Sequence, residues 1–427
     1  MNLVALIAYG GVNIFMFLFH LLGKNRIYQF PFWAAAIALG WFFPQCVGGF
    51  RIADQYPGNA YASGLVFATF CSVALWMGFY TGHEKMDYSP VWLNMKFDRK
   101  KLYVAGAILC LGGFYFRYKL MSLPEEVLGV AQWSGAAVKY LFLASIFVFG
   151  FLSIWLLYLS QNRIIVVQYL LFLIPSLLML FQAAIINGRR RAMMNLVSYL
   201  FVAPWFVRRM VLPRWLLVSG LCVGLLLVNS IGIYRSIMKN SDESFLTRLK
   251  QIAAADFTRE SEEVIEKGGA EFNNYIYLRQ VHVDLGKFDW GVKHWNGLVF
   301  NYVPGQLIGR GTKKALMFPV LNEIKLANEM YGHVFFTGTT ATGYLDAFAS
   351  FGWLGFVKFY VIGLLMGILY RHAMQGLFLG QLLYVYVLSQ AMHAISHGTH
   401  MILFSIWVYF FALGYPVLRW ARVEAEY

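Results

Sequence analysis

Apolar and polar residues alternate along this chain in long blocks, not residue by residue. An α-helix needs about 20 mostly apolar residues to cross a bilayer, and blocks of that size recur along the chain. The pattern predicts eleven membrane-spanning helices, at roughly 3–22, 30–48, 62–81, 102–118, 137–160, 164–186, 193–207, 214–232, 346–370, 374–393 and 399–418. Two of them are weaker: 102–118 ends in Arg117 and Lys119, and 193–207 is short and contains Pro204. The predicted fold class is therefore an all-α, polytopic transmembrane bundle.

One long polar segment, 233–345, separates the eighth helix from the ninth. It divides the chain into helices 1–8 (1–232), the segment itself, and helices 9–11 with a short tail (346–427). Disordered segments are poor in aromatic residues, whereas this one is rich in them, so we expect it to be folded. Residues 242–267 have helical character, and the glycine-rich part around 303–315 predicts a loop.

Basic residues mark the predicted cytoplasmic loops. Lys and Arg are enriched in short loops on that side of a membrane. With the N-terminus outside, every inner loop carries at least one of them: Lys24, Arg26, Lys85, Lys96, Arg99, Lys100, Lys101, Arg163, Arg208, Arg209, Arg214, Arg371, Arg419 and Arg422. This orientation predicts that 233–345 lies on the outer face. Arg189–Arg191 then lie outside as well, against the usual bias, so either a helix is miscounted or the cluster has a function there.

Composition agrees with a protein in lipid. The chain is 59% apolar and 13% charged, whereas a soluble domain carries roughly 25% charged residues. The net charge of +14 would suggest a nucleic-acid partner in a soluble protein, but here topology and lipid phosphates explain it. The four cysteines, Cys46, Cys71, Cys110 and Cys222, lie in apolar stretches and form no metal-binding pattern.

The arginine cluster at 189–191 is the first candidate for chemistry. A guanidinium group is planar, permanently charged and matches phosphate oxygens. At an outer interface the cluster would suit a lipid-linked diphosphate, with ordinary headgroup contact as the alternative. Arg51 lies on the same predicted face and is a second candidate.

A polar stripe near the C-terminus is the second candidate. Gln390, His393, His397 and His400 share one side of a continuous helix, unless Gly398 interrupts it. The stripe lacks the glutamate of HExxH, so no metal site is predicted. A general base and a polar seam between helices both remain open.

Basic residues of the long polar segment form the third candidate: Arg235, Arg279, His282, Arg310, Lys313, Lys314 and His333. Residues 279–284 alternate between polar and apolar, so Arg279 and His282 are not expected to share a face. The run 303–315 lacks GK[ST] and is no nucleotide-binding loop. It fits either a basic loop that reaches an anionic headgroup or a solvated loop.

The stretch 338–356, GTTATGYLDAFASFGWLGF, leads from small polar residues into an apolar helix. Small residues allow helices to approach closely in lipid. Asp346 is its one carboxylate. Lys358, just beyond it, is a cation that needs a partner inside the membrane, such as a carboxylate, a backbone carbonyl or a lipid phosphate.

This chain resembles the Wzy-type oligosaccharide repeat unit polymerases, which are relatives of the O-antigen ligases. The resemblance rests on the helix count, the late outer segment, VPGQLIGRGTKKA at 303–315 and GYLDAFASFGWLGFV at 343–357. Pro304 with Arg310 and Lys313, and Asp346 with Phe351, Gly352 and Gly355, are similar to motifs of that family. One difference matters. Ligase-like relatives carry His-Asn before the tyrosine-leucine pair, whereas this chain has Thr342-Gly343 before Tyr344-Leu345. His333 or the 393–400 stripe would have to take the place of that histidine.

The resemblance implies glycosyl transfer at the outer face of a bacterial inner membrane. A glycan on undecaprenyl diphosphate would be moved onto a lipid-linked repeat unit, without metal or other cofactor, with a chain-length regulator as a possible protein partner. The expected catalytic residues are His333, His393, His397 and Asp346. The expected substrate-binding residues are Arg51, Arg189, Arg190, Arg191, Arg235, Arg279, Arg310 and Lys313. A ligase, a transporter or flippase and a structural or signalling protein are the alternatives; the absence of an internal repeat speaks against a transporter.

Overall fold

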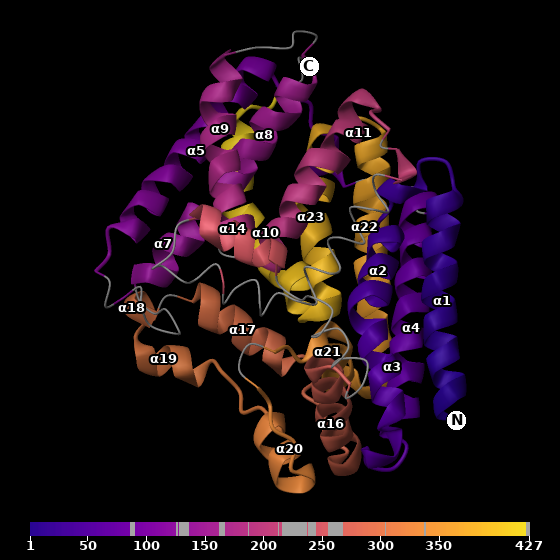
Figure 1. The fold of residues 1–427 in the computed structure, drawn as a ribbon. Helices are drawn as coiled ribbons and strands as arrows, with labels where there is room; N and C mark the ends of the chain where they lie inside the picture. Colours follow the sequence, from indigo (N-terminus) through magenta and orange to yellow (C-terminus); the bar gives the residue numbers. More distant parts are fainter. Residues whose placement is uncertain are drawn as a thin grey trace. The chain divides into compact units, whose positions relative to one another are not determined.

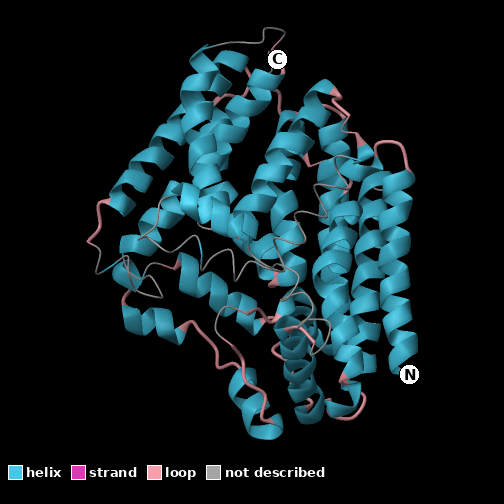
Figure 2. Ribbon diagram, in the orientation of Figure 1, coloured by secondary structure: helices cyan, strands magenta, loops and turns pink. Residues whose placement is uncertain are grey.

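The computed structural model describes residues 1–85, 90–124, 127, 136–161, 167–186, 188–211, 213–215, 237, 245–254, 268–303, 305–336 and 339–423. This part of the chain is helical and contains no strand beyond one bridge between Phe97 and Arg422 (Figure 2). It forms two compact units. The first comprises Met1–Met86, Leu212–Ile368 and Val387–Ile406, and the second comprises Asp87–Val211, Leu369–Tyr386 and Trp407–Tyr427.

Eight helices among the described residues are long and apolar enough to cross a membrane. They cover Asn2–Leu22, Phe30–Arg51, Ala60–Lys85, Lys139–Leu159, Val167–Ile185, Thr342–Met374, Phe378–Ser396 and Met401–Trp420. Each coincides with a predicted span, so the prediction of an all-helical fold is confirmed for the described residues, and eight of the predicted spans are helices of suitable length and apolarity. Regions 102–118 and 193–207 are helical but not among the eight, and 214–232 lies almost wholly outside the described residues. The count of eleven and the outer placement of 233–345 stay predictions.

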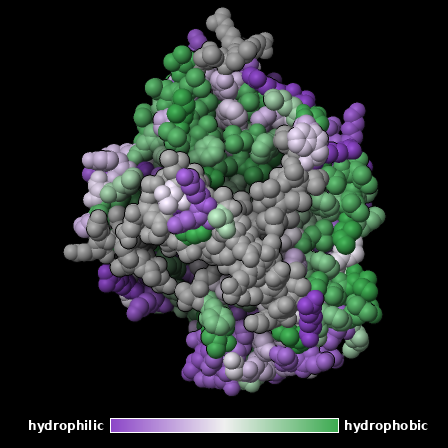
Figure 3. Space-filling model, viewed as in Figure 1, coloured by the Kyte–Doolittle hydropathy of each residue, from purple (hydrophilic) through white to green (hydrophobic). Residues whose placement is uncertain are grey.

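In the first unit, the N-terminal helices form a layered bundle: α1 (Asn2–Leu22), α2 (Phe30–Ile37), α3 (Phe43–Arg51) and α4 (Ala60–Tyr80) (Figure 1). A π-helical turn, Ala38–Phe42, joins α2 and α3 into one span. α1 packs on α2 and α4, buries Tyr9, Asn13 and Met16, and exposes large apolar side chains on its other face. Figure 3 shows this apolar flank over α1, as expected for a surface that faces lipid.

Two glycine pairs bring α22 (Phe356–Met374) into backbone contact with the span made of α4 and the π-helical turn Thr81–Lys85 that continues it. A Cβ atom added at Gly78 or Gly82 would lie 2.1 or 2.3 Å from the carbonyl oxygen of Tyr360 or Leu364. Reciprocally, Cβ atoms at Gly363 and Gly367 would lie 2.0 and 2.2 Å from the carbonyl oxygens of Leu75 and Phe79. Both helices therefore carry the small-xxx-small spacing that allows close helix packing in lipid.

The described part of 233–345 is mostly helical, with non-helical stretches such as 286–291 and 316–322. Its helices are α14 (Phe245–Ala254), α16 (Ala270–Leu285), α17 (Val292–Tyr302), α18 (Gly305–Ile308), α19 (Arg310–Ala315) and α20 (Glu323–Tyr331). Of the helix predicted over 242–267, residues 245–254 are helical and the rest lies outside the described residues. The prediction of a loop at 303–315 is wrong. Two short helices, α18 and α19, form there, and Gly309, at φ +89°, joins them.

The strand-like alternation at 279–284 was also misleading. Arg279 and His282 lie one turn apart on α16, and each is only 1% exposed, so they share the buried face. In a helix, residues three apart lie on one side, and this period overrides the alternation.

The second unit packs α5 (Arg99–Met121) against α8 (Phe147–Leu159), with α7 (Ala136–Ala144) and α9 (Val167–Phe181) beside them. A Cβ atom at Gly150 would lie 2.5 Å from the carbonyl oxygen of Gly106, so glycines again permit the close approach. The shorter helices of this region are α10 (Arg190–Val197), α11 (Ala203–Arg208), α24 (Ile406–Tyr409) and α25 (Tyr415–Trp420). α23 (Phe378–Ser396) belongs to this unit up to Tyr386 and to the first unit from Val387 onwards.

Candidate functional site

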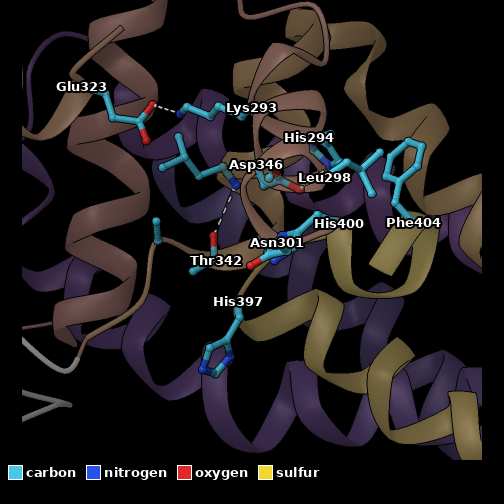
Figure 4. Close-up of a pocket in the computed structure, with 14 residues that line it drawn as sticks. Lys293, His294, Leu298, Asn301, Glu323, Thr342, Asp346, His397, His400 and Phe404 are labelled. Atoms are coloured by element: carbon cyan, nitrogen blue, oxygen red, sulfur yellow. Dashed lines mark hydrogen bonds and ion pairs between the residues drawn. The ribbon is translucent and has the colours of Figure 1, made fainter. Parts of the chain in front are cut away.

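A polar pocket of about 300 Å³ lies in the first unit, where α17, the start of α21 (Thr342–Phe351) and the turn after α23 meet. Ligand pockets typically have volumes of about 300–1,000 Å³, so this one is at the small end. It is lined by Lys293, His294, Gly297, Leu298, Asn301, Glu323, Ala341, Thr342, Leu345, Asp346, His397, Gly398, His400 and Phe404 (Figure 4). The start of α21 and the turn at 397–400 are ends of candidate membrane spans, so the pocket lies at the ends of these spans.

The start of α21 is held in an unusual conformation. Thr342 is fully buried with φ +62°, and its Oγ1 accepts a hydrogen bond of 3.3 Å from the backbone N–H of Leu345. A β-branched residue rarely adopts positive φ, and such strain is concentrated at functional sites. The next residue permits close packing, because a Cβ at Gly343 would lie 1.7 Å from the carbonyl oxygen of Ala394. These two residues fix the direction in which Asp346 leaves the helix.

Asp346 is the centre of the polar cluster. Its Oδ2 accepts hydrogen bonds from the backbone N–H of Thr399, at 2.7 Å, and from the hydroxyl of the same residue. Its side chain is 16% exposed. Two donors to one oxygen stabilise the ionised form of a carboxylate, so Asp346 brings a fixed negative charge to the pocket.

Lys358 reaches this carboxylate because the helix breaks. α21 ends at Phe351, and a 3₁₀ turn with Gly352 at φ +58° leads into α22. The Lys358 ammonium, on a residue only 7% exposed, donates to the Ser350 hydroxyl at 2.6 Å and to the Asp346 carbonyl at 3.3 Å, and lies 3.8 Å from Asp346 Oδ2. Its partners are thus a carboxylate, a carbonyl and a hydroxyl, the first two being of the kinds expected for this lysine.

His294, on α17, packs against the same cluster from the opposite side. Its Nε2 lies 3.2 Å from Thr399 Oγ1, 3.4 Å from the Lys358 ammonium and 3.5 Å from Asp346 Oδ2. Burial lowers the pKa of His294 to about 4, although the negative charge of Asp346 raises it and the positive charge of Lys358 lowers it. The imidazole is therefore neutral at pH 7.

His400 presents the accessible imidazole. Its ring centroid lies 6.1 Å from that of His294, and the residue is exposed where it lines the pocket. Partial burial lowers its pKa, and the charge of Asp346 acts in the opposite direction. A neutral, accessible imidazole beside a fixed carboxylate can accept a proton from a bound hydroxyl group.

A second charged group closes the pocket. Glu323, on α20, contacts the Lys293 ammonium at 2.5 Å and His282 Nε2 at 2.8 Å. Burial alone would raise the pKa of Glu323, but the hydrogen bond from His282 and the charge of Lys293 outweigh it, so the pKa is lowered. Glu323 thereby ties α16, α17 and α20 together and keeps the Lys293 cation at the pocket wall.

Of the predicted catalytic residues, Asp346 and His397 line this pocket. His397 is not part of the cluster: its ring stacks on His393 with centroids 3.7 Å apart, and Figure 4 shows it directed away from Asp346. α23 ends at Ser396, so the stripe from 390 to 400 does not lie on one continuous helix. This is the interruption that Gly398 suggested. His333 bonds to Asn274 Oδ1 at 2.9 Å, stacks on Tyr277 and does not line the pocket.

The predicted basic residues are dispersed. Arg279 is buried, bonds to Ser63 Oγ at 2.9 Å and stacks over Phe348 at 4.2 Å, which makes it a packing residue between α16, α4 and α21. Arg51 and Arg310 are exposed, and Lys313 bonds to the Phe300 carbonyl at 2.6 Å; none of the four lines the pocket. Arg189–Arg191 lie at the start of α10 in the second unit, and Arg235 lies outside the described residues. Diphosphate binding by the arginine cluster stays a prediction.

Sequence reasoning missed Lys293, His294 and Glu323. The first two lie in GVKHWNG (291–297), where a basic pair beside an aromatic residue was a usable signal. Nothing in the local sequence relates them to Asp346, since only the folding of α17 onto the start of α21 brings them together. Among the described residues, no group of three His, Cys, Asp or Glu side chains could hold a metal ion.

We expect His294 to remain neutral in acid. An ordinary histidine takes up its proton near pH 6.5, whereas burial moves this pKa to about 4, so between those values His294 should stay unprotonated. Solid-state ¹⁵N spectra of histidine-labelled protein in bilayers should then contain a neutral-imidazole signal at pH 5 that disappears in His294→Gln. If every histidine ring in the spectra were protonated by pH 5.5, the buried position of His294 would be contradicted.

No family model, curated protein or solved structure matches this chain.

Proposed function

We propose that this chain is a membrane glycosyltransferase that joins undecaprenyl-diphosphate-linked oligosaccharide repeat units into a bacterial surface polysaccharide, acting at the outer face of the inner membrane. The observation that carries the proposal is the surroundings of Asp346. The carboxylate belongs to the stretch that is similar to the polymerase motif, and it lies in a polar pocket beside two neutral imidazoles and a buried ammonium group.

The pocket contains the groups that such a transfer needs. His400 would take the proton from the acceptor hydroxyl as its oxygen bonds to the anomeric carbon of the donor glycan. The bond between that carbon and the diphosphate oxygen breaks, and its electron pair leaves with undecaprenyl diphosphate. Asp346 supports the base, because its negative charge raises the pKa of both His294 and His400. Lys293, at the pocket wall, would stabilise negative charge that develops on the leaving group.

The glycan profile of a strain that lacks the gene tests this proposal. We expect the long polymer to disappear while single repeat units remain attached, and the wild-type gene to restore the polymer. Loss of all attached glycan would instead indicate a ligase. An unchanged profile would contradict the proposal and favour a transporter or a structural role.

A purified assay provides the direct control. Protein reconstituted in vesicles with the lipid-linked repeat unit alone should lengthen it and release undecaprenyl diphosphate, without a nucleotide sugar. Absence of both products with correctly inserted protein would contradict the assignment even if the cellular profile changed.

A further inference from the structure

Residues 308–320 of the first unit present apolar and basic side chains together at the surface. Leu316, Phe318 and Val320 are 38%, 57% and 45% exposed, and Ile308 is 41% exposed. Arg310 and Lys314 are exposed beside them, and the sequence IGRGTKKALMFPV contains no acidic residue. Clusters of exposed apolar residues usually mark a binding surface.

Residues 316–318 of this segment are held through their backbone, which leaves the side chains of Leu316 and Phe318 exposed. The Asn296 side chain, on a residue only 9% exposed, donates to the Phe318 carbonyl at 2.7 Å and accepts from the Phe318 N–H at 2.9 Å. The Trp295 indole donates to the Leu316 carbonyl at 2.7 Å. α17 thus fixes 316–318 by three hydrogen bonds while the large apolar side chains point outwards.

The same helix contacts the ends of candidate membrane spans. The inner side of α17 carries His294, which contacts Thr399, Asp346 and Phe404 at the ends of candidate membrane spans. In Figure 1, α17 runs obliquely to α1 and α4. A segment attached to its outer side therefore lies near the ends of these candidate spans, which is where the headgroup layer of a bilayer is expected.

We propose that residues 308–320 dock on a bilayer surface rich in acidic phospholipids. Leu316, Phe318 and Val320 would insert among the headgroups, while Arg310 and Lys314 bind lipid phosphates. Basic residues combined with aromatic and aliphatic ones are the composition that binds such interfaces, and each basic residue near an anionic surface strengthens the attraction. Since α17 carries both this segment and the pocket residues Lys293 and His294, lipid contact also supports the pocket wall. The docking stands independently of the proposed reaction.

Spin-label accessibility in the full chain tests the docking. A nitroxide at Phe318→Cys, in protein reconstituted into phosphatidylcholine vesicles with phosphatidylglycerol, should collide more with oxygen than with a water-soluble nickel chelate. The matched control is Glu329→Cys on α20, whose side chain is 54% exposed; its label should show the reverse ratio. Unmodified protein gives the background from the native cysteines.

The charge requirement is tested by adding Arg310→Glu and Lys314→Glu to the Phe318→Cys protein, which should move the label into water. In vesicles of phosphatidylcholine alone, the label of the Phe318→Cys protein that keeps Arg310 and Lys314 should likewise move into water. A label as accessible to nickel as that at 329 would overturn the proposal. A label shielded from both reagents would also overturn it, because that result indicates contact with a second protein copy. Insertion of the label to the same depth with and without acidic lipid would overturn it as well.

Discussion

Asp346→Asn should reduce polymer formation by about a hundredfold or more, the range over which single groups contribute to acid–base and electrostatic catalysis. The amide has nearly the size of the carboxylate but carries no charge. It would remove the negative charge that raises the pKa of His294 and His400, and it would leave the buried Lys358 ammonium without its anion. Both hydrogen bonds from Thr399 go to a single oxygen, Oδ2, so the amide oxygen of asparagine can still accept them, and the substitution removes mainly the charge.

The measurement is the length of polymer made in a gene-deletion strain that expresses the variant at the wild-type level. Glu329→Gln, which removes an exposed carboxylate on α20, should leave the profile unchanged and serves as the matched control. A monodisperse elution of the purified variant would separate lost chemistry from lost folding. Wild-type polymer length in Asp346→Asn would exclude Asp346 from the reaction.

The membrane spans could be predicted from the sequence because each is determined by its own residues. A run such as 2–22 is apolar enough to enter lipid whatever its neighbours are, and all its backbone hydrogen bonds are internal. The prediction was weakest at 102–118 and 193–207, where Arg117, Lys119 and Pro204 interrupt the apolar run and tertiary packing decides the placement.

Local turn chemistry misled the sequence reasoning in the polar segment. Gly305, Gly309 and Gly311 suggested a loop, but only Gly309 adopts positive φ, and short helices form on either side of it. At 279–284 the polar–apolar alternation arose by chance within a helix. Both predictions fail because stretches of six to thirteen residues are too short to distinguish a helix from a loop or strand by their pattern.

Asp346 could be found from the sequence, whereas its partners could not. It stands out as the single carboxylate where a small-residue stretch becomes an apolar helix. His294 and Lys358 approach it only because α17 folds back onto α21 and because Gly352 breaks the helix before α22. The arginines chosen for their charge were dispersed by the fold: Arg279, for instance, packs against Phe348 instead of lining the pocket.

Gly363→Leu should prevent the first unit from folding correctly. The Cβ position of Gly363 is 2.0 Å from the backbone carbonyl oxygen of Leu75, and backbone atoms cannot turn aside as a flexible side chain can. α4 and α22 would have to separate, which also breaks the reciprocal contacts of Gly78 and Gly367. Overpacking a helix interface costs on the order of 3 kcal/mol, and here the cost is expected at the upper end because no rotamer relieves the contact.

The readout is the fraction of protein that elutes as a single species in detergent, together with its thermal denaturation midpoint. Gly11→Leu is the matched control: Gly11 is an exposed residue of α1, and a Cβ atom there meets nothing within 4 Å. The control should elute and melt like the unmodified protein, since its added side chain points towards lipid. Gly363→Leu should instead aggregate or melt well below it. Lys358, which contacts Asp346 in the pocket, lies in the first turn of α22, so the position of this helix should matter for the pocket. A folded, stable and active Gly363→Leu protein would show that the close contact between α4 and α22 is not needed to build the pocket.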